Sequence, residues 1–228
     1  MCFSASASFV AGSALLVVGA VTVKKAQQKR ELPYAAIPLL FGVQQLIEGV
    51  IWLTFRFDAP MLNPATTFVY SLFSHVLWPI YVPLSVLLLE PVRWRRKALV
   101  TFLLAGAAAG LFLLVSMFRF TIESRTVGGH IEYASPHFFI GAVMAGYLAG
   151  TCISALFSSH KAVNLFGIAA LLSFITSYVI YTQWLVSVWC FFAAVLSAVV
   201  FLHFTGRRHR GSSPMEWLFE NPGRNETH

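Results

Sequence analysis

Apolar residues fill seven long runs of the chain, and short polar connections separate these runs. One α-helix of roughly 20 residues crosses a bilayer hydrocarbon core of ~30 Å, and each run has about that length. The pattern therefore predicts an all-α integral membrane bundle, in which residues 1–206 form one domain of seven transmembrane helices. The helices are expected at about residues 5–23, 35–55, 67–89, 98–118, 138–157, 162–181 and 184–204.

The composition supports a membrane location and excludes a soluble domain. Hydrophobic residues make up 57% of the 228-residue chain and charged residues only 11%, whereas a soluble domain has about 25% charged residues. The net charge of +7 comes from short basic clusters between the apolar runs. Such clusters are typical of cytoplasmic loops and do not indicate a nucleic-acid partner.

Basic residues alternate between the connections and predict the orientation of the chain. The odd-numbered connections carry them in excess, whereas the even-numbered connections are balanced or uncharged. Because positively charged loops stay in the cytoplasm, we expect the N-terminus outside and the C-terminus inside the cell's inner (plasma) membrane. Residues 207–228 are expected to form a basic tail on the cytoplasmic membrane surface.

Polar residues interrupt the second and third runs. The second run contains Gln44, Gln45 and Glu48, and the third contains Ser71 and His75. A polar side chain in hydrocarbon costs several kcal/mol unless it is satisfied. Glu48 and His75 lie roughly 12 Å below the outer end of their helices, given the helical rise. We therefore expect the two side chains to lie within hydrogen-bond reach, directly or through one water or ion.

Three interpretations of this site remain open. The first is a structural pair that fixes the register of two helices. The second is a divalent zinc, iron or copper ion held by Glu48 and His75, with Cys190 as third ligand and His137 and Cys2 as reserves. The third is a proton relay or ligand site of a sensor or transporter.

A wider set of side chains is expected to line the same site. The connection at residues 119–137 contains Gly128-Gly129-His130, which is consistent with a lid over an external pocket or with a solvated hairpin. Pro79 and Pro83 are expected to kink the third helix. The side chains that we expect to contact a ligand are Gln44, Gln45, Ser71, Trp78, Tyr178 and His130.

Four strings of sequence resemble a bacterial family of uncharacterised multi-pass membrane proteins. They are Met-Cys-Phe-Ser-Ala at residues 1–5, the segment at 38–49, Ser-His-Val-Leu-Trp-Pro at 74–79 and the segment at 188–193. This resemblance implies a membrane location and no particular activity.

The spacing Ser71-x-x-x-His75 is also similar to that of the seven-helix hydrolases that include alkaline ceramidases and adiponectin receptors. That resemblance implies a metal-dependent hydrolase of lipid-like molecules. The chain departs from the pattern because it lacks their following Asp, and the last helix holds only His203 in place of a His-x-x-x-His pair.

The expected function is that of an integral membrane protein with a buried polar site in the outer half of the bundle. The site would bind a metal and act on a small or lipid-like molecule. The alternatives are a proton- or ligand-coupled sensor or transporter, and a structural subunit of a membrane complex. If the protein is an enzyme, the sequence favours a metal-dependent one.

Overall fold

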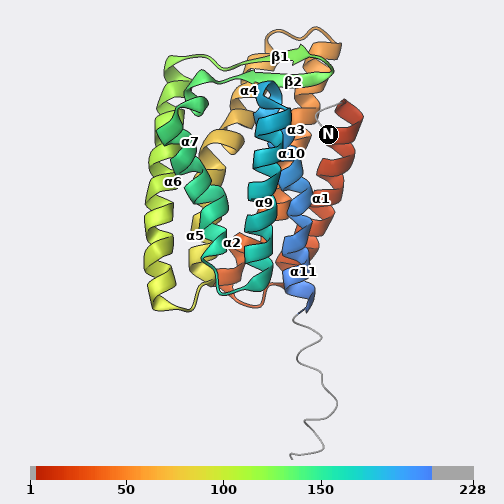
Figure 1. Ribbon diagram of the computed structural model, residues 1–228. Coiled ribbons are helices and arrows are strands. Elements are labelled where there is room, and N and C mark those ends of the chain that lie inside the picture. The colour runs from red at the N-terminus through yellow and green to blue at the C-terminus, as the bar shows by residue number, and fades with distance from the viewer. Residues whose placement is uncertain (1–3, 207–228) are drawn as a thin grey trace, which may run out of the picture.

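The computed structural model describes residues 4–206, apart from the side chains of Pro136 and Thr182. Cys2 and the basic tail at residues 207–228 lie outside the described residues. Helices run side by side along one axis, and a β-hairpin lies across one end of them (Figure 1). This hairpin is the one departure from the predicted all-α fold within the described part of the chain.

Six helical segments are long and apolar enough to cross a membrane. They contain these elements: α1 (Ala5–Lys25); η1 (Lys29–Glu31), α2 (Leu32–Ala35) and α3 (Ile37–Arg56); α4 (Leu62–Ser71), η2 (Leu72–Leu77) and α5 (Trp78–Leu89); α6 (Arg93–Arg119); α9 (Lys161–Ile180); and α10 (Leu185–Leu196) with α11 (Ala198–Gly206). Each of them overlaps one of the predicted runs, so these six predictions are confirmed as apolar helices.

The fifth predicted run forms a shorter apolar helix, Gly141–Leu156. It consists of α7 (Gly141–Leu148), the π-helical turn η4 (Ala149–Ile153) and α8 (Ser154–Leu156). The chain before it is taken up by the 3₁₀ turn η3 (Pro136–Phe139), which begins at a proline. At 1.5 Å per residue the helix is about 24 Å long, less than the ~30 Å hydrocarbon core.

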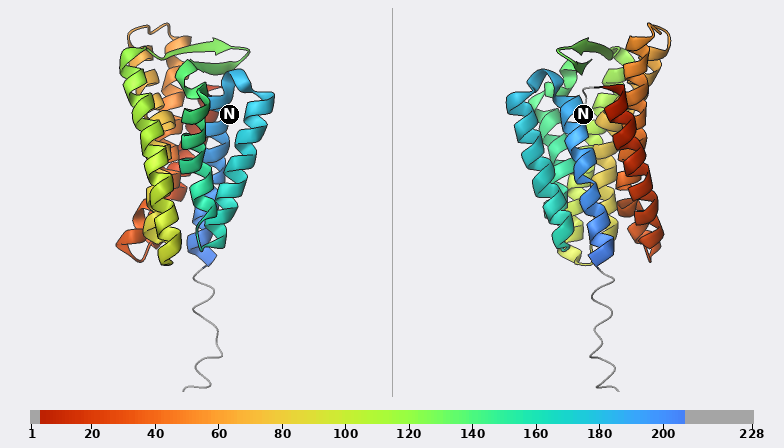
Figure 2. Two further views of the ribbon diagram at one scale, coloured as in Figure 1. Left: turned by 60° about the vertical axis from the view of Figure 1, so that its left-hand side comes forward. Right: turned by 90° about the vertical axis from the view of Figure 1, so that its right-hand side faces the viewer.

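The described part of the chain starts and finishes at opposite ends of the bundle. The start of α1 lies at the hairpin end, and the end of α11 lies at the other end (Figures 1 and 2). The shorter helix Gly141–Leu156 lies alongside the six long segments in this arrangement.

The outward faces of the long helices are apolar, and many of their polar residues point inward. Fully buried polar side chains include Gln44, Glu48 and His75, whereas Phe118 and Val179 are each 74% exposed. This inversion of the soluble pattern indicates a multi-pass membrane protein. Other exposed apolar side chains on these helices are Val10, Val17, Leu104, Leu111, Leu165, Leu172 and Leu202.

The two ends of the bundle differ in charge. Within the described residues, the end opposite the hairpin has nine lysines and arginines and two glutamates, both of which are buried. The hairpin end has three arginines and three acidic residues. The first group is Lys24, Lys25, Lys29, Arg30, Arg93, Arg95, Arg96, Lys97 and Lys161 with Glu31 and Glu90; the second is Arg56, Arg119 and Arg125 with Asp58, Glu123 and Glu132.

The buried carboxylate of Glu90 joins two connections at the end of the bundle that is rich in lysine and arginine. Glu90 accepts hydrogen bonds from the backbone N–H and the hydroxyl of Ser159, both at 2.6 Å. Arg95 donates to the carbonyl oxygen of Ser158 at 2.7 Å. Burial alone raises the pKa of Glu90, but the hydrogen bonds and the Arg95 charge outweigh it and hold the pKa below its ordinary value.

Two prolines distort the helix that runs from α4 to α5. Its central turn, η2, is π-helical, and the N–H of Trp78 donates to the carbonyl of Phe73. The next donor in this pattern would be Pro79, which has no N–H, so the carbonyl of Ser74 loses its partner in the helix. Pro83 withdraws a donor from the carbonyl of Pro79 in the same way.

Neighbouring helices occupy both of these carbonyl groups. The Tyr147 hydroxyl on α7 donates to the Ser74 carbonyl. The Pro79 carbonyl lies against the α-carbons of Gly106 on α6 and Gly150 on η4, where a side chain on either glycine would overlap it. Such Cα–H···O contacts partly replace the missing hydrogen bond. The small-residue face that begins at Gly106 therefore serves close helix packing.

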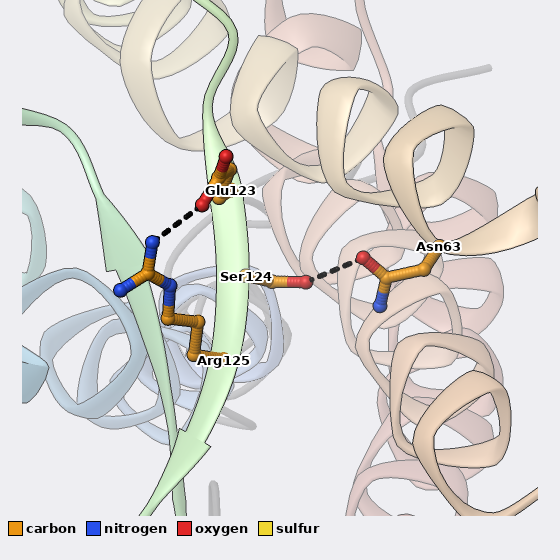
Figure 3. Close-up of polar contacts among 4 residues, drawn as sticks. All are labelled: Asn63, Glu123, Ser124 and Arg125. Atoms are coloured by element: carbon orange, nitrogen blue, oxygen red, sulfur yellow. Dashed lines mark hydrogen bonds and ion pairs between the residues drawn. The ribbon is translucent and has the colours of Figure 1, made fainter. Parts of the chain in front are cut away.

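The hairpin consists of β1 (Glu123–Val127) and β2 (His130–Ala134), which pair antiparallel. Gly128 and Gly129 connect them with φ angles of 58° and 79°, the left-handed conformation that a two-residue type I′ turn requires. The hairpin is fastened to α4, because the Ser124 hydroxyl donates to Asn63 at 3.0 Å and lies 2.8 Å from that of Thr67. Figure 3 shows the Ser124–Asn63 bond beside the exposed Glu123–Arg125 ion pair.

We predict that Gly106→Ala destabilises the bundle and that Gly141→Ala does not. The new methyl group at position 106 would overlap the Pro79 carbonyl, whereas a methyl group at position 141 would meet no other atom within 4 Å. The overlap is expected to cost about 1–3 kcal/mol, more than the helix propensity that alanine adds. Thermal unfolding in detergent, followed by circular dichroism, measures both variants. Equal midpoints for Gly106→Ala and the unmodified protein would contradict the prediction.

Candidate functional site

Buried polar side chains gather in the half of the bundle nearest the hairpin. They come from α3, the end of α4, η2, α10 and the turn after β2, and each is at most 6% exposed. Helices far apart in sequence therefore share one polar interior at this level. Its members are Gln44, Gln45, Glu48, Ser71, Ser74, His75, Ser135 and Ser187.

His75 is held by two serines. Its Nδ1 lies 2.8 Å from the Ser74 hydroxyl, and its Nε2 lies 2.9 Å from the Ser135 hydroxyl. The edge of the imidazole packs against Phe138, with 5.3 Å between ring centres. Because Ser135 follows β2, this contact joins the hairpin to the distorted helix.

Both ring nitrogens of His75 lie within hydrogen-bond distance of a serine hydroxyl, so one nitrogen can hold the proton while the other accepts. The Ser74 hydroxyl also lies 3.4 Å from the carbonyl oxygen of Ser71. In the tautomer with the proton on Nδ1, Ser74 accepts from Nδ1 and donates to that carbonyl, and Nε2 accepts from the Ser135 hydroxyl.

Glu48 forms a second polar cluster between α3 and α10. Its Oε1 accepts a hydrogen bond of 2.6 Å from the Ser187 hydroxyl. The Gln45 amide and the Tyr70 hydroxyl are hydrogen-bonding neighbours of the carboxyl group, and the Cys190 thiol lies close to it. The carboxyl group of Glu48 is therefore fully buried among polar side chains from α3, α4 and α10.

Glu48 and His75 are both fully buried, as the sequence predicts, but no hydrogen bond joins them. Serines engage both ring nitrogens of His75, so none is left for the carboxylate. The two helices are joined instead by Trp78, whose indole N–H donates to Gln44 Oε1 at 2.7 Å. The Trp78 ring stacks on Phe41 with 3.8 Å between centres.

The predicted metal ligands do not converge within the described residues. No group of three His, Cys, Asp or Glu side chains that could hold a metal ion occurs there. Cys190 lies near Glu48, whereas His137 stacks on Phe120 at 4.6 Å between ring centres. Cys2 lies outside the described part of the chain.

The remaining predicted residues divide between the site and its surroundings. Gln45 lies beside Glu48, and the buried hydroxyl of Ser71 makes no hydrogen bond among the described residues. Tyr178 stacks on Phe174 and is 42% exposed, away from the site. His130 is the first residue of β2, and its ring centre lies 4.9 Å from that of Trp184. Burial lowers the pKa of His130 below its ordinary value.

A pocket of about 220 Å³ opens between α6 and the hairpin. Its helix wall comes from positions spaced three and four apart on one face of α6, and its other wall comes from the segments that enter and leave the hairpin. Ser135 lines this pocket, and its hydroxyl bonds to His75, so one residue connects the pocket with the buried histidine. The lining residues are Leu113, Ser116, Met117, Phe120, Thr121, Ile122, Glu123, Ala134, Ser135 and His137.

A second cavity lies deeper, among aromatic side chains. Trp78, Tyr147 and Trp189 line it together with Cys190. Its volume of about 20 Å³ has room for one water molecule. It is too small for an organic ligand in this structure.

Sequence reasoning missed the serines that contact the site and the tyrosine that supports it. Ser135 and Ser187 bond to His75 and Glu48, and Tyr147 bonds to the Ser74 carbonyl. Ser187 carries a weak signal, because it lies one turn before Cys190 on the same helix. Ser135 lies in an irregular connection, where no periodicity indicates the direction of a side chain.

Comparison with known proteins places the chain in a family and assigns no activity. No curated protein and no solved structure shows significant similarity to it. The resemblance to the seven-helix hydrolases therefore receives no support. A profile for a family of unknown function, DUF6629, matches residues 1–215, nearly the whole chain. The protein belongs to this family of unknown function.

Proposed function

We propose that this multi-pass membrane protein binds a small amphiphilic, lipid-like molecule in the pocket between α6 and the hairpin. The His75–Ser135 pair lies at the polar end of this pocket. The observation that carries the proposal is the double role of Ser135, which lines the pocket and bonds to a fully buried histidine. Polar groups at the wall of an otherwise apolar pocket are typical of sites that orient a ligand.

The chemistry of the pocket walls supports an amphiphile. Leu113, Met117 and Phe120 give α6 an apolar wall that suits an acyl chain. Ser135 and His137 lie on the opposite, polar wall. The only charged side chain among the lining residues is an acidic one, Glu123, so a neutral or positively charged head group fits better than an anionic one.

We propose further that the hairpin end faces outward. The opposite end carries the excess of lysines and arginines, which marks cytoplasmic loops. In this arrangement Gly141–Leu156 is the seventh span. Its short length would be accommodated by local thinning of the bilayer or by its position against neighbouring helices.

Thiol labelling of intact cells tests this orientation. In a Cys2→Ser background, an impermeant maleimide is expected to label Thr126→Cys on the hairpin, and to label Arg96→Cys only after lysis. Both positions are exposed, and the native Cys152 and Cys190 are buried. Labelling of Arg96→Cys alone in intact cells would reverse the proposed orientation.

Photolabelling tests the pocket. A diazirine-bearing fatty alcohol, which has a neutral head group, is added to the protein in vesicles and is expected to label pocket residues such as Met117 and Phe120 in a saturable manner. Met117→Trp fills the pocket and should lower this labelling at least about fivefold, a free-energy change near 1 kcal/mol. Mass spectrometry of the digested protein locates and quantifies the adducts.

Val115→Trp is the matched control, because Val115 lies on the same helix and is 47% exposed. It should leave labelling of the pocket unchanged. Uniform labelling of all exposed helix faces, or equal losses in the two tryptophan variants, would contradict a specific pocket.

A second candidate function, cation binding, is favoured by the Glu48 cluster. A carboxylate is costly in a fully buried site, and a bound cation would offset that cost. The Cys190 thiol lies nearby and would favour zinc, iron or copper over magnesium. His75 is not required in this set.

Elemental analysis of gently purified protein tests this candidate. We expect about one equivalent of metal in the unmodified protein and in Cys152→Ser, and loss of the metal in Glu48→Gln and Cys190→Ser. Chelation should lower the unfolding temperature, because a ligand of the folded state stabilises it by mass action. Metal content below about 0.1 equivalent, with no stabilisation by added zinc, iron or copper, would reject the candidate.

A further inference from the structure

His75 and the two serines that contact it have the relative positions of a base, a nucleophile and a group that orients the base. The Ser135 hydroxyl lies 2.9 Å from Nε2, and the Ser74 hydroxyl lies 2.8 Å from Nδ1. Both distances are within the range in which a proton passes from a hydroxyl to an imidazole. The three residues come from two segments that are 60 positions apart in the chain.

We infer that Ser135 is a catalytic nucleophile, that His75 is its general base and that the substrate is a carboxylic ester of an amphiphilic molecule. The inference rests on the proposed function, because the substrate must enter the pocket that Ser135 lines. It assigns to this pocket a chemical step that needs no metal ligand set, only water as second substrate.

The environment of His75 prepares it for this role. In the tautomer with the proton on Nδ1, Ser74 accepts a hydrogen bond from Nδ1, and the lone pair of Nε2 points at the Ser135 hydroxyl. Tyr147 fixes the backbone at this point by its bond to the Ser74 carbonyl. Phe138 packs on the ring and limits its rotation. Ser74 and Tyr147 are therefore positioning residues.

The reaction balances without an oxidant or reductant. Ser135 Oγ forms a bond to the ester carbonyl carbon while its proton moves to Nε2 of His75. The bond from that carbon to the alkoxy oxygen then breaks, and His75 returns the proton to the departing alcohol. Water, deprotonated by His75, next attacks the acyl group on Ser135, and release of the carboxylic acid restores both side chains.

The simpler alternative is that the Ser135–His75 bond only fastens the hairpin to the bundle. Ser124 provides the comparison, because its hydroxyl also joins the hairpin to the helices but touches Asn63 and Thr67 instead of a histidine. A fastening role predicts similar behaviour of the two serines toward a serine-directed reagent. A nucleophile predicts that only Ser135 reacts.

An alkyl fluorophosphonate tests the inference on the purified full-length protein in detergent. Attack by Ser135 Oγ forms an O–P bond, fluoride leaves and the hydroxyl proton passes to His75. We expect one adduct per chain, located at Ser135 by mass spectrometry. Ser124→Ala should react at the same rate as the unmodified protein, whereas His75→Leu should react at least about 100-fold more slowly.

Two results would overturn the inference. One is the absence of an adduct at Ser135 in folded protein under conditions that label a known serine hydrolase. The other is labelling of Ser135 at an unchanged rate in His75→Leu.

A second measurement is available if His75→Leu fails to fold. Ser135→Cys in the Cys2→Ser background introduces a thiol at the same position, and iodoacetamide should alkylate it at least about tenfold faster than it alkylates Ser124→Cys, because His75 generates the thiolate. Equal rates would overturn the inference.

Photolabelling with the diazirine-bearing fatty alcohol separates this failure from failure of the pocket itself. Saturable labelling of Met117 and Phe120 without any adduct at Ser135 would leave the pocket in place and remove the nucleophile. Loss of both signals would reject the pocket as well.

Discussion

The bundle depends on two backbone carbonyl groups that prolines deprive of their helical donors. Pro79 and Pro83 lie near the middle of the helix from Leu62 to Leu89, where no bulk water can replace the missing hydrogen bonds. Tyr147 on α7 donates to one of these carbonyls, and Gly106 and Gly150 approach the other closely. The prolines therefore determine which helices surround this one and how near they come.

The same distortion positions the polar interior. The π-helical turn η2 contains Ser74 and His75, and the widened turn directs the imidazole toward the hairpin end, where Ser135 meets it. The hairpin is consequently attached to the bundle at two places. Ser124 bonds to Asn63 on α4, and Ser135 bonds to His75 on η2. Between these attachments and α6 lies the pocket to which we assign the function. The contacts around Ser74 and His75 therefore serve three purposes. They satisfy a carbonyl group that Pro79 deprives of its donor, they attach the hairpin, and they border the proposed ligand site.

Much of the fold could be predicted from the sequence, because the apolar runs are long and their chemistry is unambiguous. The burial of Glu48 and His75 followed from the cost of placing them in lipid, and the Gly128-Gly129 pair indicated a turn. The start of the fifth helix was harder to predict: Phe138 and Phe139 are apolar enough to belong to the run, but they lie in a 3₁₀ turn and the helix begins at Gly141.

The sequence predicts Glu48 and His75 within hydrogen-bond reach, directly or through one water or ion; no direct hydrogen bond joins them, and the reason is geometric. Depth along a helix is one coordinate, and contact also requires that the two side chains point toward each other. A π-helical turn adds about one residue, which rotates the following positions by about 100° around the axis. Gln44 and Trp78 therefore meet between these helices, and each charged or ionisable group bonds to a serine. Serines are common in membrane helices, so their sequence positions gave little indication of these roles.

The proposed pocket and its chemistry depend most directly on the bond between the His75 imidazole and the Ser135 hydroxyl. A double-mutant cycle with His75→Leu, Ser135→Ala and the double variant measures the coupling free energy of this bond by unfolding in detergent. We expect a coupling of about 1 kcal/mol or more, because each single variant leaves a buried polar group without its partner. Additive effects, with a coupling below about 0.3 kcal/mol, would contradict the contact on which both the pocket and the proposed chemistry rest.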